Sequence, residues 1–284
     1  MFGPQSSRPY SDGCLESEDG KGVVIAQHAP RQNHLLAALP RDSYERLLPD
    51  LEPVPLPLGL TLHDAGDRER YVYFLTAGIV ARVYVMECGA SKEFAVTGSE
   101  GVIGIASFLG GESTPSRAVV LSAGSAYRLR AHLLSSEFDH DGPLAGFLLR
   151  YTLALMAQIG QIAACNRHHP LKRRLSRWIL SCVDRLPTNE LTMTHELIAD
   201  MLGVRRVGVT EALGKLQEAR LIQCSRGHIA VLDRPRMEAR ACECYGVVKR
   251  EYDRLLHRDG TIGNANVHSA RRPVREDSFY AESA

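Results

Sequence analysis

The segment 191–216 contains residues whose types and spacing are suited to recognition of another polymer. Ala199, Gly203 and Val209 follow an Ala-x3-Gly-x5-apolar spacing. A small residue lets two helices approach closely, a glycine permits the positive φ of a tight turn, and an apolar residue packs the second helix on the first. Thr194 is a suitable N-cap for the first helix. The spacing therefore predicts a helix-turn-helix pair.

The start of the second helix, predicted over 204–217, has side chains that can hydrogen-bond to nucleic-acid bases. A guanidinium can grip guanine N7 and O6 together, so Arg206 is the expected base reader. Lys215 and Arg226 are expected to contact phosphates, which positions a protein without reading sequence. The expected DNA-binding residues are Arg205, Arg206, Gly208, Thr210, Glu211, Lys215 and Arg226. For each single arginine, the alternative is an ordinary surface charge.

A hairpin and a concentration of positive charge accompany this helix pair. Two strand-like runs, 221–224 and 228–232, are separated by a Ser-Arg-Gly turn, which predicts a wing directly after the second helix. Residues 166–258 contain 18 Lys or Arg against 11 Asp or Glu, although the whole chain has a net charge of only +1. An excess of seven positive charges favours contact with a phosphate backbone.

A strand-rich domain is predicted ahead of this module. Between 54 and 129, short runs rich in Val, Ile, Tyr and Leu, such as 71–75 and 79–85, alternate with glycines. This alternation is typical of antiparallel strands joined by tight turns, as in a sandwich or roll. A short helical segment over 35–51, interrupted by prolines, introduces the domain.

A long helix is predicted between the two domains, over 143–166. Its apolar residues recur at intervals of three and four, which places them on one face. They are Leu144, Leu148, Tyr151, Leu155, Ile159 and Ile162. We expect this stripe to form a two-helix dimerisation seam with a second copy of the chain. The alternative is that the stripe packs on the β-domain.

The next helix is expected to begin at Pro170. Its periodicity places Leu175 and Trp178 inside and Arg174 and Arg177 on the surface, as a basic shoulder.

The seven cysteines are scattered, lack a CxxC pair, and are expected to be reduced thiols. Cys242 and Cys244 lie in a stretch that resembles a helix, where residues two apart point to different faces. We therefore expect no metal site and no cofactor. Haem stays open as a ligand, and the histidines available for it are His28, His34, His63 and His132.

Several classes of protein are not expected. No apolar run approaches the roughly 20 residues of a membrane span, and the polar first 20 residues do not resemble a signal peptide. We therefore expect a cytoplasmic protein without a membrane partner. The sequence contains no P-loop, GxSxG or HExxH motif, so an enzyme is not expected.

In their order, these features resemble the Crp-Fnr family of bacterial transcription regulators. The resemblance covers about residues 35–234 and includes the basic helix with Trp178, the helix pair and the wing. It implies an α+β fold: an N-terminal antiparallel β-roll, cupin-like and cyclic-nucleotide-binding-like, a long dimerisation helix, and a C-terminal winged helix-turn-helix. It also implies a homodimer on near-palindromic double-stranded DNA, with RNA polymerase as a partner if the protein activates transcription. The alternative is a cyclic-nucleotide-like sensor module without DNA-regulatory output.

Five segments are expected along the chain. They are a disordered segment 1–30, a β-roll sensor domain 31–140, a dimerisation helix 141–168, a winged helix-turn-helix domain 169–258 and a disordered tail 259–284.

The chain departs from the family's best-known members in the recognition helix. Those members have a Glu directly after the Arg that matches Arg206, and another Arg four positions further. Val207 and Glu211 stand at these places here. The family's familiar half-site is therefore not expected to apply.

A second departure concerns the effector pocket. Cyclic-AMP-binding members hold the ribose with a Gly-Glu pair and the phosphate with an Arg-Ser or Arg-Thr pair. The matching positions here are Gly104, Ile105, Ser116 and Arg117. Ile105 can accept no hydrogen bond, and the reversed order of Ser116 and Arg117 turns the cation to the other face of a strand. We predict that cyclic AMP is not the physiological effector.

Overall fold

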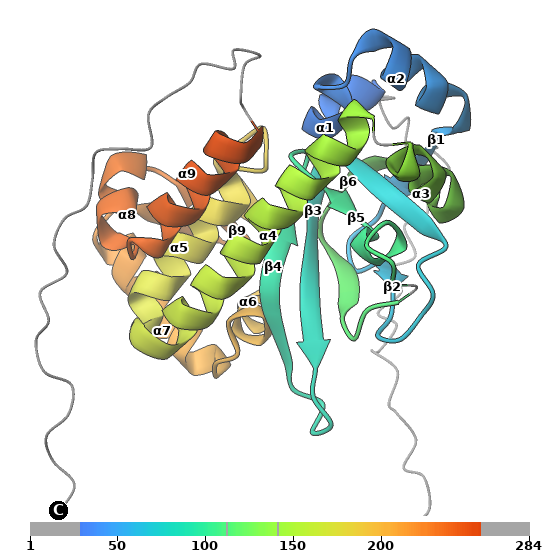
Figure 1. Cartoon of the computed structure of the whole chain (residues 1–284). Coiled ribbons are helices and arrows are strands. Elements are labelled where there is room, and N and C mark those ends of the chain that lie inside the picture. Colours follow the sequence, from blue (N-terminus) through green and yellow to red (C-terminus); the bar gives the residue numbers. More distant parts are fainter. Residues whose placement is uncertain (1–28, 112, 141, 257–284) are drawn as a thin grey trace, which may run out of the picture.

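The computed structural model describes residues 29–111, 113–140 and 142–256. Strands gather on one side of the molecule and most helices of the C-terminal half on the other, with the long helix α4 between them (Figure 1). The predicted order of β-domain, long helix and winged helix-turn-helix is confirmed. The two predicted disordered ends lie outside the described residues, except for residues 29 and 30.

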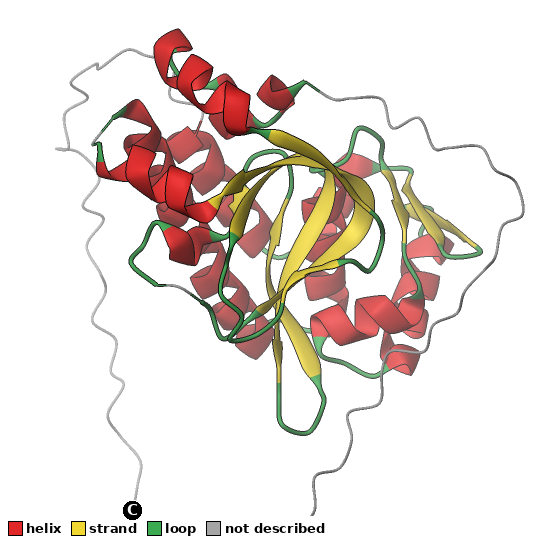
Figure 2. Cartoon of the chain, turned by 90° about the vertical axis from the view of Figure 1, so that its right-hand side faces the viewer, coloured by secondary structure: helices red, strands yellow, loops and turns green. Residues whose placement is uncertain are grey.

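One antiparallel sheet forms the N-terminal domain. Its strands within the described residues are β1 (Glu52–Leu56), β2 (Thr61–His63), β3 (Tyr71–Val85), β4 (Ser91–Thr97), β5 (Val102–Ile103) and β6 (Arg117–Arg130). The central order is β1-β6-β3-β4, while β2 pairs with β6 and β5 with β3. Figure 2 shows how the long strands curl into a roll.

The runs 71–75 and 79–85, expected as separate strands, belong to the single strand β3. Gly78 has φ +86° and lies where the register of β3 against β6 shifts. A Cβ on Gly78 would lie 2.6 Å from the Ser122 carbonyl oxygen, and one on Gly124 would lie 2.1 Å from that of Ala77. The two glycines thus let two strands cross closely at a bend, without breaking either strand.

Short helices cover the end of the roll. They are α1 (His34–Ala37), α2 (Arg41–Leu47) and α3 (Ala131–Asp139), with one-turn helices at Pro30–Gln32, Leu48–Asp50 and Ile105–Ser107. Asn33 caps α1 and also donates from Nδ2 to the carbonyl oxygens of Leu75 at 2.9 Å and Gly101 at 2.8 Å. The introductory helices are therefore fixed to the sheet.

The helix α4 spans Pro143–His168, close to its predicted extent. Its stripe residues Leu144, Leu148, Tyr151, Leu155 and Ile162 are buried within the single chain, and Ile159 is half-buried. They lie against β4 and against a C-terminal helix, α9 (Cys244–Leu256). The Tyr151 hydroxyl donates to the Val102 carbonyl oxygen at 3.1 Å, and that of Tyr252 on α9 to Gln158 Oε1 at 2.9 Å. This burial contradicts the expectation that the stripe faces a second copy, and agrees with packing on the β-domain.

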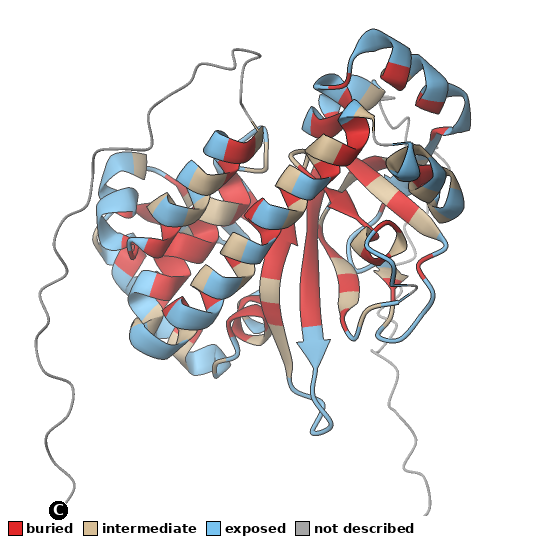
Figure 3. Ribbon diagram, in the orientation of Figure 1, coloured by how far each residue is buried: buried red, intermediate tan, exposed pale blue. Residues whose placement is uncertain are grey.

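The opposite face of α4 is apolar and exposed. Leu149, Leu153 and Met156 are 51%, 48% and 63% exposed, and Figure 3 shows exposed residues along this outward face. Among the described residues, α4 is the one helix with the length and mean hydropathy, 1.2, that a membrane span can have. Its buried stripe indicates a helix packed between two parts of a folded protein.

Up to residue 256, where the described part of the chain ends, the C-terminal half contains six elements of the winged module and two further helices. They are α5 (Leu171–Val183), β7 (Glu190–Thr192), α6 (His195–Leu202), α7 (Arg206–Glu218), β8 (Ile222–Ser225), β9 (His228–Val231), α8 (Arg234–Arg240) and α9. The strands form a small antiparallel sheet in the order β7-β9-β8, separate from the roll (Figure 2).

The two halves share one core through α5. Trp178 is fully buried, and its indole Nε1 donates to Glu93 Oε2 of β4 at 2.6 Å. Burial raises the pKa of Glu93 above its ordinary value, although the Trp178 hydrogen bond lowers it. Arg174 and Arg177 are also buried, at 8% and 4% exposed, because α5 is enclosed by the sheet and the neighbouring helices. The prediction that these two arginines form a surface shoulder is wrong.

Candidate nucleic-acid interface

The helices α6 and α7 form the predicted helix-turn-helix. Thr194 Oγ1 accepts the Leu197 amide at 3.1 Å and caps α6. Gly203 ends α6 in the left-handed region, at φ +61° and ψ +49°. Val209 on α7 is fully buried in the core that also contains Ala199. All three residues of the predicted spacing therefore serve the turn and its packing as expected.

The outward face of α7 presents polar and charged side chains to solvent. Arg205, Arg206, Thr210, Glu211 and Lys215 are exposed, as predicted. Arg205 occupies the N-cap position but makes no side-chain capping hydrogen bond. The positive end of the α7 dipole is therefore open to an anion such as a DNA phosphate.

Gly208 differs from the other predicted contact residues. It is half-buried, and a Cβ at this position would lie 3.1 Å from Cδ2 of Leu171 on α5. Its small size permits close packing of α7 on α5, and it does not stand on the exposed face.

Two contacts between α6 and α7 arrange the exposed face. Arg206 Nε lies 3.7 Å from Glu196 Oε2, and both side chains are largely exposed. Such a pair contributes little in water, so Arg206 can leave it for a base edge. His195 Nδ1 lies 3.0 Å from Thr210 Oγ1. His195 was not among the predicted residues, and its place at the first turn of α6 is the signal that could have identified it.

The wing is a tight hairpin. Its turn contains Arg226 at φ +45° and Gly227 at φ +82°, and the Arg226 side chain is exposed. The Met193 amide donates to the Gly227 carbonyl oxygen at 2.7 Å, which ties the turn to the segment before α6. Arg226 is thus held at the edge of the helix-turn-helix, where a phosphate contact was predicted.

The four predicted effector-pocket residues have separate roles. Gly104 lies in a turn at φ +101°, and Ile105 is half-buried beside the main core of the roll. Ser116 is buried, and its Oγ lies 3.2 Å from Thr114 Oγ1. Arg117 forms two hydrogen bonds with Asp64, at 2.8 and 3.0 Å, which lower the pKa of that carboxyl. Arg117 also lines a cavity of about 530 Å³ between the roll and the start of α6.

Comparison with known proteins matches both halves of this architecture. A cyclic nucleotide-binding domain model matches residues 53–141, and a Crp-like helix-turn-helix domain model matches 173–240. The chain belongs to the Crp-Fnr family. It is a DNA-binding transcription regulator, and the second match coincides with α5 to α8.

Relatives of this Crp-Fnr protein include two proteins named global nitrogen regulator. The one from Synechococcus elongatus is 27% identical over 184 residues, which cover 62% of this chain and 83% of that protein. The one from a Nostoc strain is 26% identical over 181 residues, covering 60% and 81%.

Solved structures of the family share the fold. FixK2 from Bradyrhizobium japonicum superimposes with a TM-score of 0.60 at 17% identity, covering 68% of this chain and 98% of that one. A Crp/Fnr regulator from Eubacterium rectale gives a TM-score of 0.59 at 18% identity, covering 72% and 96%. The helix α9 follows the residues matched by the helix-turn-helix model.

Proposed function

We propose that the protein binds a near-palindromic operator as a homodimer in the cytoplasm. The observation that supports this most directly is the exposed, uncapped start of α7, together with an exposed arginine in the wing. A twofold dimer would present two such helices about one DNA turn, roughly 34 Å, apart. RNA polymerase is a further expected partner if the protein activates transcription.

Base reading is assigned to the first turn of α7. Arg206 is the expected reader of guanine through N7 and O6. Val207 is 62% exposed although it is apolar, which suits contact with a thymine methyl group. Lys215 and Arg226 would contact phosphates on either side of these bases.

The dimer is proposed to form through the exposed face of α4. Leu149, Leu153 and Met156 are spaced four and three residues apart, and the small residues Gly160 and Ala163 continue this face toward the C-terminal end. Apolar residues at this spacing suit a helix pair related by a twofold axis, and small residues allow close approach. This face replaces the buried stripe as the expected seam.

Selection of bound sequences from random double-stranded DNA tests the proposal. We expect an enriched site with two inverted half-sites whose centres are about 10 base pairs apart. Enrichment of a single half-site would refute the dimer arrangement. Binding without any enrichment would refute sequence-specific regulation.

A further inference from the structure

Four potential metal ligands meet at the junction between α4 and the bend that joins α8 to α9. Cys165 and His169 lie four residues apart at the end of α4, Cys242 lies in the bend, and Cys244 is the first residue of α9. The three sulfurs and one ring nitrogen all lie within 4.8 Å of one another. The three cysteines are buried, so the cluster is enclosed by the fold.

The distances in this cluster suit a single ion. Cys165 Sγ lies 3.4 Å from Cys242 Sγ, and Cys244 Sγ lies 3.5 Å from His169 Nδ1. A tetrahedral zinc ion with Zn–S bonds of about 2.3 Å places its sulfur ligands about 3.8 Å apart. Three thiolates and one imidazole form one of the ligand sets of structural zinc sites, and soft sulfur ligands favour this metal. We propose that Cys165, His169, Cys242 and Cys244 bind one Zn²⁺ ion.

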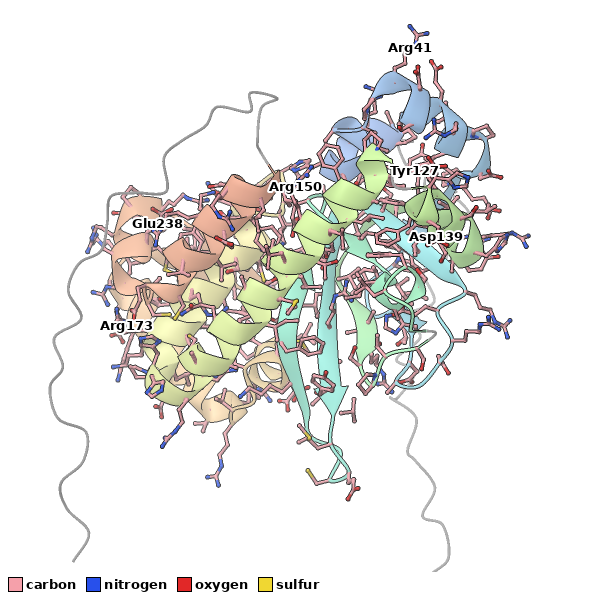
Figure 4. All side chains as sticks on the ribbon, in the orientation of Figure 1. Arg41, Tyr127, Asp139, Arg150, Arg173 and Glu238 are labelled. Atoms are coloured by element: carbon pink, nitrogen blue, oxygen red, sulfur yellow. The ribbon has the colours of Figure 1, made fainter. Side chains whose placement is uncertain are left out.

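Neighbouring side chains orient the proposed ligands. His169 Nε2 lies 3.1 Å from Glu243 Oε1, which leaves Nδ1 directed at the sulfurs. Histidine ligands of metals commonly donate their second N–H to a carboxylate, which fixes the ring and its tautomer. Gln161 Nε2 donates to Cys244 Sγ at 3.1 Å. Arg173, labelled in Figure 4 on the outer side of the helical half, lies 3.5 Å from Glu243 Oε2.

Two buried positive charges near the cluster are consistent with an anionic zinc–thiolate site. Zn²⁺ with three thiolates has a net charge of −1, and a buried charge requires a compensating partner. Arg174 and Arg177 are buried beside the cluster and interact electrostatically with Cys165. The Nε atom of each has no hydrogen-bond partner within the described residues. An anionic metal site explains why α5 buries two guanidinium groups.

The arrangement also explains why the sequence pattern was misleading. Cys242 and Cys244 were expected on one helix, pointing to different faces. Ala241 has an extended backbone, φ −66° and ψ +163°, which ends α8 before Cys242. Both sulfurs then turn toward Cys165, so the argument that the two side chains point to different faces of one helix does not hold.

Metal analysis of the full chain, purified without an affinity tag, tests the proposal. We expect one zinc per chain by mass spectrometry. After exchange with Co²⁺, we expect thiolate-to-cobalt charge transfer and the strong visible bands of tetrahedral coordination. A chain that stays free of zinc after loading and dialysis, or a cobalt spectrum without thiolate bands, would overturn the proposal.

Variants separate a site from adventitious binding. Cys165→Ser and Cys244→Ser should lose the bound zinc, whereas Cys88→Ser, which alters an exposed cysteine between β3 and β4, should retain one equivalent. Zinc retained by both cluster variants would overturn the assignment. A Cys165–Cys242 disulfide in chain purified under reducing conditions would also contradict it.

Glu243→Gln provides a test that does not remove a ligand. This variant should keep its fold and one zinc, but competition with a chelator should show affinity lowered by about 10- to 100-fold. The exposed Glu45, which forms an i,i+4 pair with Arg41 on α2, provides a matched Glu45→Gln control with unchanged affinity. Equal affinity in the two variants would refute the role of Glu243, and with it the Nδ1 coordination.

Discussion

Arg206 pairs weakly with the exposed Glu196, so its guanidinium is available for DNA. Replacement by alanine should cost about 1 to 3 kcal/mol of binding free energy on the selected operator and much less on random DNA. Fluorescence anisotropy with both DNAs at one salt concentration measures the difference. The matched variant Lys215→Ala should weaken both affinities similarly, because a phosphate contact carries no sequence information. Equal losses for Arg206→Ala would show that it, too, contacts only phosphate.

Local signals explain why this site could be predicted from sequence. Thr194 caps α6 by a hydrogen bond to an amide only three residues further along the chain. Gly203 adopts a left-handed backbone conformation that few other residues tolerate. The buried arginines of α5 were not predictable in the same way. Their burial follows from the packing of α5 against elements that are distant in the chain, and no spacing within α5 indicates it.

At the scale of elements, α4 has two apolar faces: one is buried within the chain, and the other is exposed and is the proposed dimer seam. Met156→Glu places a charge on the exposed face and should dissociate the dimer in sedimentation experiments, while the protomer stays folded. Val247→Glu, at an exposed apolar position on α9, is the control and should remain dimeric. If Met156→Glu still sediments as a dimer, the seam lies elsewhere.

Leu155, one position before Met156, should behave differently. It is buried in its own chain, so Leu155→Ala should lower the free energy of unfolding by about 2 to 5 kcal/mol. Urea denaturation curves, recorded at several protein concentrations, separate this loss of unfolding free energy from dissociation, because only dissociation depends on protein concentration. An effect confined to the monomer–dimer equilibrium would restore the original assignment of the stripe.

The sequence predicted the length of α4 and its apolar stripe, but it favoured a second copy over the β-domain as the surface that covers the stripe, and it did not indicate α9. Periodicity shows that a face is buried, without showing by what. Here α9, distant in the chain, covers the stripe together with β4. The boundary between α8 and α9 contains no glycine or proline, so the residue types there do not predict the bend either.

At the scale of the whole molecule, Glu93 joins the roll to the DNA-binding half and should make their contact pH-dependent. Its raised pKa means that the folded state holds this proton more tightly than the unfolded state, despite the opposing charges of Arg177 and Arg185. The stabilisation is complete below the ordinary carboxyl pKa of 4.5 and is lost as the pH rises through the folded-state pKa. We therefore expect the melting temperature of the wild type to fall as the pH rises. In Glu93→Gln this fall should be smaller. The exposed variant Glu52→Gln should leave this fall unchanged, and an identical pH profile for Glu93→Gln and the wild type would refute the linkage.

The roll is predicted not to use cyclic AMP. Ile105 cannot accept the ribose hydroxyl, and Arg117 is already paired with Asp64 in its own chain. Loss of two charge-assisted hydrogen bonds, each typically about 1.5 to 3 kcal/mol, weakens binding by very roughly a hundredfold or more. Calorimetric titration of the full chain should show no micromolar binding. Micromolar affinity accompanied by tighter operator binding would contradict the prediction.

The packing of α9 on α4 also limits how this regulator can be recombined with others. A chimera joined between His169 and Pro170, with a foreign DNA-binding domain that ends after the wing, would lack Tyr252 and Leu255. The helix α4 of the chimera, which comes from this protein, would then expose the stripe that these two side chains help to enclose. A DNA-binding domain that is exchanged into this protein must therefore supply a helix equivalent to α9, and the unit of exchange includes α9 as well as the wing.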